Sequence, residues 1–368
     1  MKIGILTMPL ASNYGGTLQN FALQTILKRL GYDPITIRFP SMYQNRSLIS
    51  SLKLYINLLS RHIVKKILGM QTTRPLLPNA WKKNTENFEN FIQKYIETTV
   101  YVDNITMDLC NQYGIESLIV GSDQVWRPEV PDVINRYFCK FAEKNEIPRI
   151  SYAASLALDK WTFSSKQTQK ITTLLQNFSS VSVREENGVA LLKNNAACNA
   201  VWVIDPTMLL TKEDYMDISK DIPRSNEQYI FTYILDPSEE KTTYVSELAK
   251  AKGLKVVSFN DKATDSSASI EKWLSHFRDA SFVITDSFHG TVFSILFEKQ
   301  FLCFENRHRG NARMESLKEM TGLHDRFVCE KIKDHSDINY SKVNSKLNTM
   351  KSLSLQYLQN AISNTALN

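Results

Sequence analysis

Short runs rich in β-branched residues alternate with longer helical patterns along this chain of 368 residues, and this alternation constrains the fold most strongly. Candidate strands include Lys2–Met8, Ser117–Val120 and Phe282–Thr285, and candidate helices include Thr17–Leu30 and Glu239–Lys252. Such alternation is typical of parallel sheets that are covered by helices on both faces. We therefore predict an α/β protein with two Rossmann-like, doubly wound domains that face each other across a cleft.

The domain boundaries are predicted from chain length and from one proline. A chain of this length is expected to form two domains, and Pro206 cannot continue a central strand. We predict an N-terminal domain over residues 1–206 and a C-terminal domain over 207–339. Residues 340–368 have a helical pattern and are expected to pack back on the first domain.

Cysteine usage and hydropathy indicate a cytoplasmic protein. The five cysteines are scattered and form no CxxC pair, which fits free thiols in a reducing compartment. The first strand is interrupted by Pro9 too early for a signal peptide. No run reaches the about 18–20 apolar residues that span a bilayer.

One stretch is purely basic. No Asp or Glu occurs between residues 34 and 85, and the segment 46–74 has an apolar stripe at helical spacing from Leu52 to Ile67. A helix of this kind suits the anionic inner face of a membrane, so we predict peripheral docking there. The alternative is a helix that buries the stripe in the core and leaves the charges in water. Nucleic acid is not expected, because no aromatic platform is interleaved with the basic residues.

A strand–turn–helix pattern places an acid and a histidine close together. Asp286 and His289 follow the candidate strand Phe282–Thr285, with Ser287 and Gly290 beside them. Ligands of open α/β sheets bind at the carboxyl ends of strands, where helix N-termini attract anions. We predict a site for acid–base chemistry here. The alternative is that His289 packs in a domain seam and Asp286 only caps the helix.

Two further turns follow strands of the first half. The first carries a pair of glycines before a helix; its candidate ligand-binding residues are Asn13, Tyr14, Gly15, Gly16 and Gln19. It is not a GxGxxG fingerprint, so no nicotinamide cofactor is expected. In the second, Asp123 can act as a base or hold a sugar hydroxyl beside Ser122, and Trp126 can stack on a sugar. Equally, Ser122 and Asp123 can cap a helix while Trp126 lies in the core.

Arginines follow two other candidate strands. Arg184 ends one strand, and Arg309, Asn311 and Arg313 surround the turn after Phe301–Phe304. Guanidinium groups at these places can hold a carboxylate or phosphate through two hydrogen bonds. The alternatives are a local ion pair between Arg184 and its neighbouring glutamates, and a solvated basic loop.

Seven short motifs, several of them described above, follow one another along the chain. They are Asn13–Gln19, Gly121–Asp123, Ser151–Ser155, Ser182–Glu185, Asp205–Thr207, Ser287–Gly290 and Arg309–Leu317. As an ordered set they resemble the polysaccharide pyruvyl transferase family. The resemblance implies a glycosyltransferase-B-like fold and transfer of pyruvate from phosphoenolpyruvate to two hydroxyls of a sugar as a cyclic ketal. It also implies that the substrates are precursors of capsule, exopolysaccharide or cell-wall polymer.

The resemblance also implies roles for the two domains. The first domain is the acceptor side, binding a lipid-linked or polymeric sugar, and the second is the donor side. His289, Asp286 and Asp123 are the expected acid and base, and no metal or cofactor is expected besides phosphoenolpyruvate as co-substrate. Some members have an arginine shortly before the His-Gly pair, where this chain has Asp286, Ser287 and Phe288. Either Arg309 or Arg313 is then expected to supply that charge, or the donor is held differently.

Two other functions remain open from sequence. One is a sugar-nucleotide glycosyltransferase of the same architecture, since a fold does not fix a function. The other is a non-catalytic, membrane-associated protein of polysaccharide assembly, for which the basic segment is the main argument. The sequence does not indicate the oligomeric state.

Overall fold

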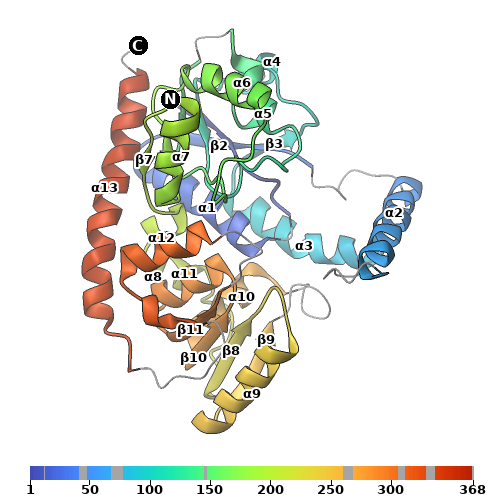
Figure 1. The fold of residues 1–368 in the computed structure, drawn as a ribbon, viewed down its shortest axis with the longest axis vertical. Helices are drawn as coiled ribbons and strands as arrows, with labels where there is room; N and C mark the ends of the chain where they lie inside the picture. The colour runs from blue at the N-terminus through green and yellow to red at the C-terminus, as the bar shows by residue number, and fades with distance from the viewer. Residues whose placement is uncertain are drawn as a thin grey trace.

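Two parallel sheets, one above the other along the long axis of the molecule, form the framework of the protein (Figure 1). The computed structural model describes residues 1–11, 13–40, 48–67, 78–144, 147–259, 268–305, 311–328 and 336–366. Every strand pairing in the two sheets is parallel. Helices therefore connect the strands and cover the faces, as the alternation in the sequence predicts.

The first sheet has the strand order β3-β2-β1-β4-β5. Its strands are β1 (Lys2–Leu6), β2 (Asp33–Arg38), β3 (Thr98–Tyr101), β4 (Ser117–Val120) and β5 (Arg149–Ser151). The pair β6 (Ser182–Val183) and β7 (Val201–Trp202) continues beyond β5 through two isolated bridges. The direction of winding reverses between β1 and β4, which is the switch point where ligands bind in such sheets.

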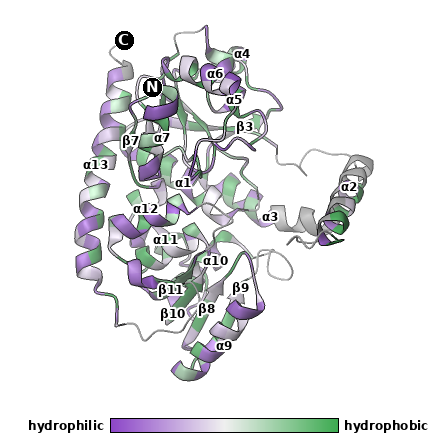
Figure 2. Ribbon diagram, viewed as in Figure 1, coloured by the Kyte–Doolittle hydropathy of each residue, from purple (hydrophilic) through white to green (hydrophobic). Residues whose placement is uncertain are grey.

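The second sheet has the order β12-β11-β10-β8-β9. Its strands are β8 (Tyr229–Tyr233), β9 (Lys255–Phe259), β10 (Phe282–Thr285), β11 (Gln300–Phe304) and β12 (Phe327–Val328). Here the winding reverses between β8 and β10, as in flavodoxin-like sheets. Figure 2 shows the hydrophobic strands of this sheet beneath helices with mixed faces.

Helices and short 3-10 turns link the strands. They are α1 (Tyr14–Arg29), α2 (Leu48–Ile67), α3 (Pro78–Tyr95), α4 (Met107–Gln112), α5 (Val133–Arg136), η1 (Lys140–Ala142), α6 (Ser165–Leu175), α7 (Glu186–Ala196), η2 (Pro206–Leu209), α8 (Lys212–Ile218), α9 (Glu239–Lys252), α10 (Ile270–Asp279), α11 (Phe288–Leu296), α12 (Ala312–Thr321), η4 (His324–Arg326) and α13 (Tyr340–Ala366). Several begin at a side-chain cap: Ser164 and Thr211 both form capping boxes. At the other end, α9 stops at Gly253, whose φ of 62° suits glycine.

The two halves share one hydrophobic core around α1. Tyr14 stacks on Trp273 of α10 with ring centroids 5.3 Å apart, and its ring edge meets Phe259 of β9. The Tyr14 hydroxyl donates to the Ala268 carbonyl at 2.8 Å. Helix α13 also contacts both halves: it packs on α12, and its Tyr357 donates to the Ser151 carbonyl of β5. These contacts fix how the carboxyl ends of the two sheets meet.

The predicted fold class, α/β with two Rossmann-like doubly wound units of the glycosyltransferase-B type, is confirmed by this topology. The proposed boundary between residues 206 and 207 falls in η2, between the sheets, and stays a prediction. Helix α11 begins at Phe288, so His289 lies in its first turn. No helix of the described residues is long and apolar enough to cross a membrane.

Candidate active site

The N-terminal ends of α1 and α11 touch at the seam between the two halves. Asn13 caps α1 by accepting from the Gly16 amide at 3.0 Å, and Ser287 caps α11 by accepting from the Gly290 amide at 3.3 Å. A Cβ atom on Gly15 would lie 2.0 Å from His289 Nδ1 and 2.7 Å from its Cβ. Only glycine at position 15 therefore allows His289 to pack against α1.

Asp205 is the hub of a buried polar network at this seam. Its Oδ1 accepts from the amide and hydroxyl of Thr207, at 3.0 and 2.7 Å. Its Oδ2 accepts from Ser122 Oγ at 2.9 Å and from Arg184 Nη1 at 2.8 Å, and lies 3.6 Å from His289 Nε2. Burial alone would raise the pKa of Asp205, but His289 and Arg184 hold that pKa well below its usual range. Asp205 is therefore a fixed negative charge between Arg184 and His289.

Arg184 is fully buried among three carboxylates. Besides Asp205, its guanidinium lies 4.0 Å from Asp123 Oδ1 and 4.0 Å from Glu185 Oε1. Burial would lower the pKa of Arg184, yet the three carboxylates raise it. Its Nε and Nη2 have no hydrogen-bond partner among the described residues, and neither has His289 Nε2. Buried polar atoms left without a partner are costly, so these donors point to a ligand.

Arg313 brings a second buried guanidinium to the seam. The Cζ atoms of Arg184 and Arg313 lie 4.7 and 5.8 Å from the centre of the Phe288 ring. Burial, followed by the charge of Arg184, lowers the pKa of Arg313 to about 10. Two of the three arginines predicted to bind the donor, Arg184 and Arg313, thus lie beside the same aromatic ring. Arg309 lies outside the described residues, so its membership stays a prediction.

Helix α12, which carries Arg313, is fixed to the first half of the chain. Ser316 Oγ accepts from the Glu186 amide of α7 at 2.9 Å. At the start of the helix, the Ala312 amide donates to Asp159 Oδ1 at 3.2 Å, next to the predicted donor-site residue Asn311. The second half therefore contributes its arginine to a site whose other guanidinium belongs to the first half.

Asp123 has a strained backbone beside this network. Its φ of 77° is in the left-handed region that non-glycine residues rarely adopt. The Asp123 carbonyl accepts from the Ser155 amide at 3.0 Å, which holds the turn in place. A Cβ on Gly16 would lie 3.1 Å from Asp123 Oδ2. The carboxylate thus lies between the start of α1 and Arg184, and such strain is often found at functional sites.

Asp286 lies at the switch point of the second sheet, where its carboxylate accepts hydrogen bonds from two backbone amides and a lysine. Its carboxylate accepts from the amides of Leu235 and Asp236, at 2.6 and 3.0 Å, and from Lys241 Nζ at 2.6 Å. These bonds tie the turn after β8 to the turn after β10. The predicted role of Asp286 as a base is therefore revised: its oxygens are occupied, and it positions the start of α11.

Three predicted acceptor residues lie in the core rather than facing a ligand. Trp126 is fully buried, stacks on Phe138 with centroids 5.0 Å apart, and donates its indole N–H to the Tyr137 carbonyl. Tyr14 is part of the shared core described above. Gln19 donates to Thr7 Oγ1 and to the Gly16 carbonyl, at 2.8 Å each. We correct these three assignments, because all three side chains are almost fully buried and present no face to a sugar.

Gly290 is needed for packing rather than for a ligand. An added Cβ would lie 2.3 Å from Thr285 Oγ1, so the glycine lets α11 approach the end of β10. This close approach brings His289 to the seam. Gly290, which was predicted as part of the site, therefore has a structural role in packing.

Two seam residues were not predicted as site residues. Asp205 and Glu185 both occur in the motifs that carry the family resemblance, but neither was predicted to bind a ligand or to take part in the chemistry. Asp205 directly precedes Pro206 after a short strand, and only the fold shows that Arg184, Ser122 and His289 converge on it. Glu185 Oε1 accepts from Ser155 Oγ, while its Oε2 has no hydrogen-bond partner among the described residues.

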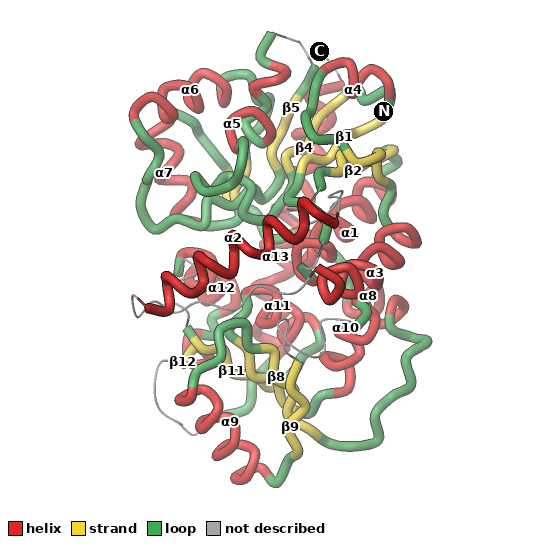
Figure 3. The backbone as a smooth tube through the Cα atoms, turned by 90° about the vertical axis from the view of Figure 1, so that its right-hand side faces the viewer, coloured by secondary structure: helices red, strands yellow, loops and turns green. Residues whose placement is uncertain are grey.

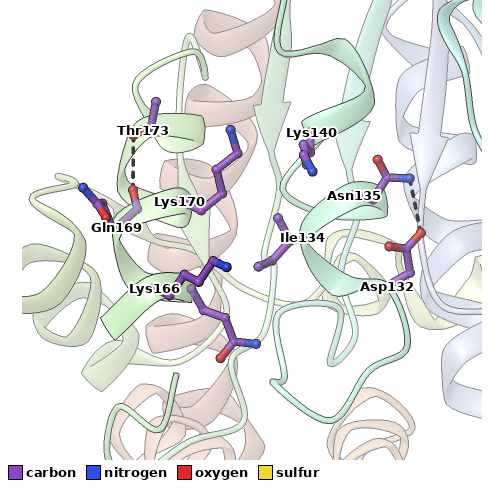
Figure 4. Close-up of a pocket in the computed structure, with 9 residues that line it drawn as sticks. Asp132, Ile134, Asn135, Lys140, Lys166, Gln169, Lys170 and Thr173 are labelled. Atoms are coloured by element: carbon purple, nitrogen blue, oxygen red, sulfur yellow. Dashed lines mark hydrogen bonds between the residues drawn. The ribbon is translucent and has the colours of Figure 1, made fainter. Parts of the chain in front are cut away.

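A separate cavity of about 560 Å³ lies in the first half between α5, η1 and α6 (Figure 4). Lys140, Lys166 and Lys170 line it, and Lys170 Nζ is paired with Glu143. None of the predicted site residues lines this cavity. Within the described ranges, no cluster of His, Cys, Asp and Glu has a composition suited to a metal ion.

The fold and the seam define a two-unit α/β protein of the glycosyltransferase-B type with two buried arginines between its halves. The model of the polysaccharide pyruvyl transferase family matches residues 13–308, and the chain belongs to this family. The predicted resemblance is thereby confirmed, and with it a transferase of polysaccharide biosynthesis that acts on a sugar acceptor. A comparison with curated protein sequences gave no match.

Solved structures with similar folds include two epimerases of sugar nucleotides. UDP-GlcNAc 2-epimerase from Neisseria meningitidis, bound to UDP-GlcNAc, is 9% identical over 98% of this chain and 94% of its own, with a TM-score of 0.49. The UDP-GlcNAc 2-epimerase from Methanocaldococcus jannaschii is 11% identical over 95% and 93%, with a TM-score of 0.47. Similarity at this level says nothing of the substrate of this chain.

Proposed function

We propose that the protein transfers pyruvate from phosphoenolpyruvate to two hydroxyls of one sugar, forming a cyclic ketal in capsule, exopolysaccharide or cell-wall polymer synthesis. Family membership supports the transfer of a pyruvyl group to a sugar. The observation that carries the choice of donor is the pair of buried guanidiniums of Arg184 and Arg313 beside one aromatic ring. Phosphoenolpyruvate carries a carboxylate and a phosphate, so its site must supply several cations.

The donor site we propose is built from both halves of the chain. Arg184 presents buried N–H groups without a hydrogen-bond partner among the described residues, and Arg313 is a cation that an anion would stabilise. The N-terminus of α11, at Ser287, adds the positive end of a helix dipole. Asn311 and Arg309 complete the proposed set. Anion binding here would offset the repulsion between the two buried guanidiniums.

The reaction we propose needs one acid and one base. The acid protonates the methylene carbon of phosphoenolpyruvate, which makes C2 electrophilic. The first sugar hydroxyl then bonds to C2 and gives its proton to the base. Next the C2–O bond to phosphate breaks, and the second hydroxyl closes the ketal. One hydroxyl proton thus replaces the proton delivered to carbon, and the other leaves with phosphate.

His289 and Asp123 are the groups we propose for these proton transfers. His289 lies in the first turn of α11, 3.6 Å from Asp205, which can hold its imidazole in place. Asp123 lies between Arg184 and the start of α1, where Asn13 is exposed. A sugar bound at Asn13 and Gly16 would place its hydroxyls near this carboxylate. Ser122, predicted to bind the sugar, is fully buried and donates to Asp205, so we assign it to the hub instead. Arg184 would then hold the donor on the other side of the base.

The test is a two-product assay with the purified full chain. Phosphoenolpyruvate is incubated with a panel of methyl hexosides, N-acetylhexosaminides and lipid-linked disaccharides, and phosphate release and acceptor mass are measured together. We expect one phosphate for each acceptor that gains pyruvate less water. A UDP-sugar replaces phosphoenolpyruvate in the matched control. Glycosyl transfer in that control, or no binding of phosphoenolpyruvate at millimolar concentration, would refute the proposal.

A further inference from the structure

Helix α2 stands apart from both sheets of the molecule. It is attached through α3, which is its chief neighbour among the described residues. Figure 1 shows α2 beside the body, level with the seam between the halves, and the rotated view in Figure 3 shows it crossing that level. The alternative that this helix buries its apolar stripe in the core of the first half therefore does not hold.

The apolar stripe of α2 is exposed. Leu52, Ile56, Ile63 and Ile67 are 54%, 58%, 50% and 78% exposed, and their spacing of four, seven and four residues puts them on one helix face. Val64 is 55% exposed beside them. These are five of the nine large apolar side chains that are exposed in the described part of the chain, and the other four are scattered. Single exposed apolar residues are common, whereas a concentration on one element indicates an interaction surface.

The excess positive charge of the chain is concentrated around the same helix. Residues 34–85 contain nine Lys and Arg and no Asp or Glu, and α2 itself carries Lys53, Arg61, Lys65 and Lys66. The remaining residues then hold 35 basic against 38 acidic side chains, so the rest of the protein is net negative. The partner of α2 must therefore combine an apolar surface with negative charge.

We propose that α2 docks on an anionic lipid bilayer, with its axis in the membrane plane and its stripe among the upper acyl chains. An amphipathic helix with a basic polar face is suited to this position. A second copy of the chain fits less well, because both α2 helices would bring positive charge with no acid in the stretch to pair with it. If the proposed function holds, docking brings the seam level with a lipid-linked acceptor. The docking itself does not depend on that function.

Co-sedimentation with vesicles tests the proposal. The full chain is mixed with phosphatidylcholine vesicles, with or without phosphatidylglycerol, at low and at high salt. We expect binding that needs phosphatidylglycerol and weakens with salt. Changing Lys53, Arg61, Lys65 and Lys66 to Gln should weaken the partition roughly fivefold for each charge removed. Changing Ile56, Ile63 and Ile67 to Ser should weaken it by about tenfold or more.

Matched control variants separate this surface from general charge and hydrophobicity. The charge control replaces four exposed lysines on other helices by Gln: Lys193, Lys250, Lys272 and Lys342. The apolar control changes the scattered exposed residues Val256 and Leu353 to Ser. Both controls should bind vesicles like the wild type. Because α2 lies apart from the cores, its variants should keep the wild-type circular dichroism spectrum and phosphate release with a water-soluble acceptor.

Three results would overturn the docking proposal. They are no binding to phosphatidylglycerol vesicles at low salt, binding indifferent to the α2 variants, and a dimer in sedimentation velocity that the Ile-to-Ser variant converts to monomer. The last result would assign the surface to a second copy of the chain. Loss of transfer activity with intact vesicle binding would instead count against the proposed function alone.

Discussion

The buried pair of Arg184 and Asp205 gives the sharpest prediction for stability. In Asp205→Asn, the Oδ1 bonds to Thr207 can persist, so the loss is confined to the Oδ2 side. That oxygen accepts from Arg184 at 2.8 Å and from Ser122 at 2.9 Å. Removing one partner of a buried ion pair costs about 3–5 kcal/mol, because the other charge stays buried.

The expected loss for Asp205→Asn lies at the lower end of that range. Asp123 and Glu185 remain 4.0 Å from Arg184 and continue to compensate its charge. Urea denaturation followed by tryptophan fluorescence should therefore show a loss of about 3 kcal/mol in the free energy of unfolding. The matched control is Asp214→Asn, which weakens a partly exposed ion pair with Arg29. That variant should lose less than about 1 kcal/mol.

A double-mutant cycle decides whether the two charges act as a pair. Replacing Arg184 by Met in the Asp205→Asn background removes the uncompensated cation. The double variant should therefore lose at least about 1 kcal/mol less than the sum of the two single variants. If the losses add within about 0.5 kcal/mol, the reasoning on this pair is refuted.

The pH dependence of this effect follows from the direction of the Asp205 shift. The folded-state pKa is depressed, so the contribution to stability is fully present above the unfolded value of about 3.9. It is lost as the pH falls further and the carboxylate takes up a proton. The difference between wild type and Asp205→Asn should therefore be constant around neutral pH and shrink below about pH 4. A difference that grows on acidification would contradict this sign.

Four further predictions concern catalysis and positioning. His289→Asn should lower kcat by about 10²–10⁴-fold while phosphoenolpyruvate still binds in calorimetry; near-normal turnover would leave His289 a structural role only. Gly15→Ala should also lower kcat strongly, because the new Cβ displaces His289; a crystal structure with an unmoved imidazole would disprove that reason. Arg313→Lys should raise the KM for phosphoenolpyruvate more than it lowers kcat, since lysine lacks the planar fork. Lys241→Met removes one of the donors to Asp286 and should cost about 1.5–3 kcal/mol of stability with kcat nearly unchanged; a loss of kcat like that of His289→Asn would return Asp286 to the chemistry.

The fold could be predicted because its signals are local. Ser117–Val120 and Phe282–Thr285 are buried strands with the predicted bounds. In contrast, β3 and β12 were not predicted, since they are edge strands of four and two residues that depend on pairing with a neighbour. Strands this short contain too few residues to show a hydrophobic periodicity of their own.

The candidate site was predictable only in part. Arg184 and His289 were found because each follows a strand and precedes or opens a helix. The hub, Asp205, gains its importance from contacts with residues 21, 83 and 84 positions away, which no local pattern reveals. Trp126 was misassigned for the same reason. In the sequence, a tryptophan that follows a strand and faces a ligand cannot be distinguished from one that, as here, packs on another aromatic ring, Phe138.

The central claim is that residues at the seam between the two sheets protonate the bound enol phosphate of phosphoenolpyruvate and transfer the resulting pyruvyl group to the sugar. The most direct measurement is the mass spectrum of the acceptor after incubation with phosphoenolpyruvate in D₂O. We predict a ketal whose methyl group carries one deuterium, formed by the wild type and greatly reduced in His289→Asn. An acceptor that stays unchanged while phosphoenolpyruvate is bound, or a ketal without deuterium, would contradict the account.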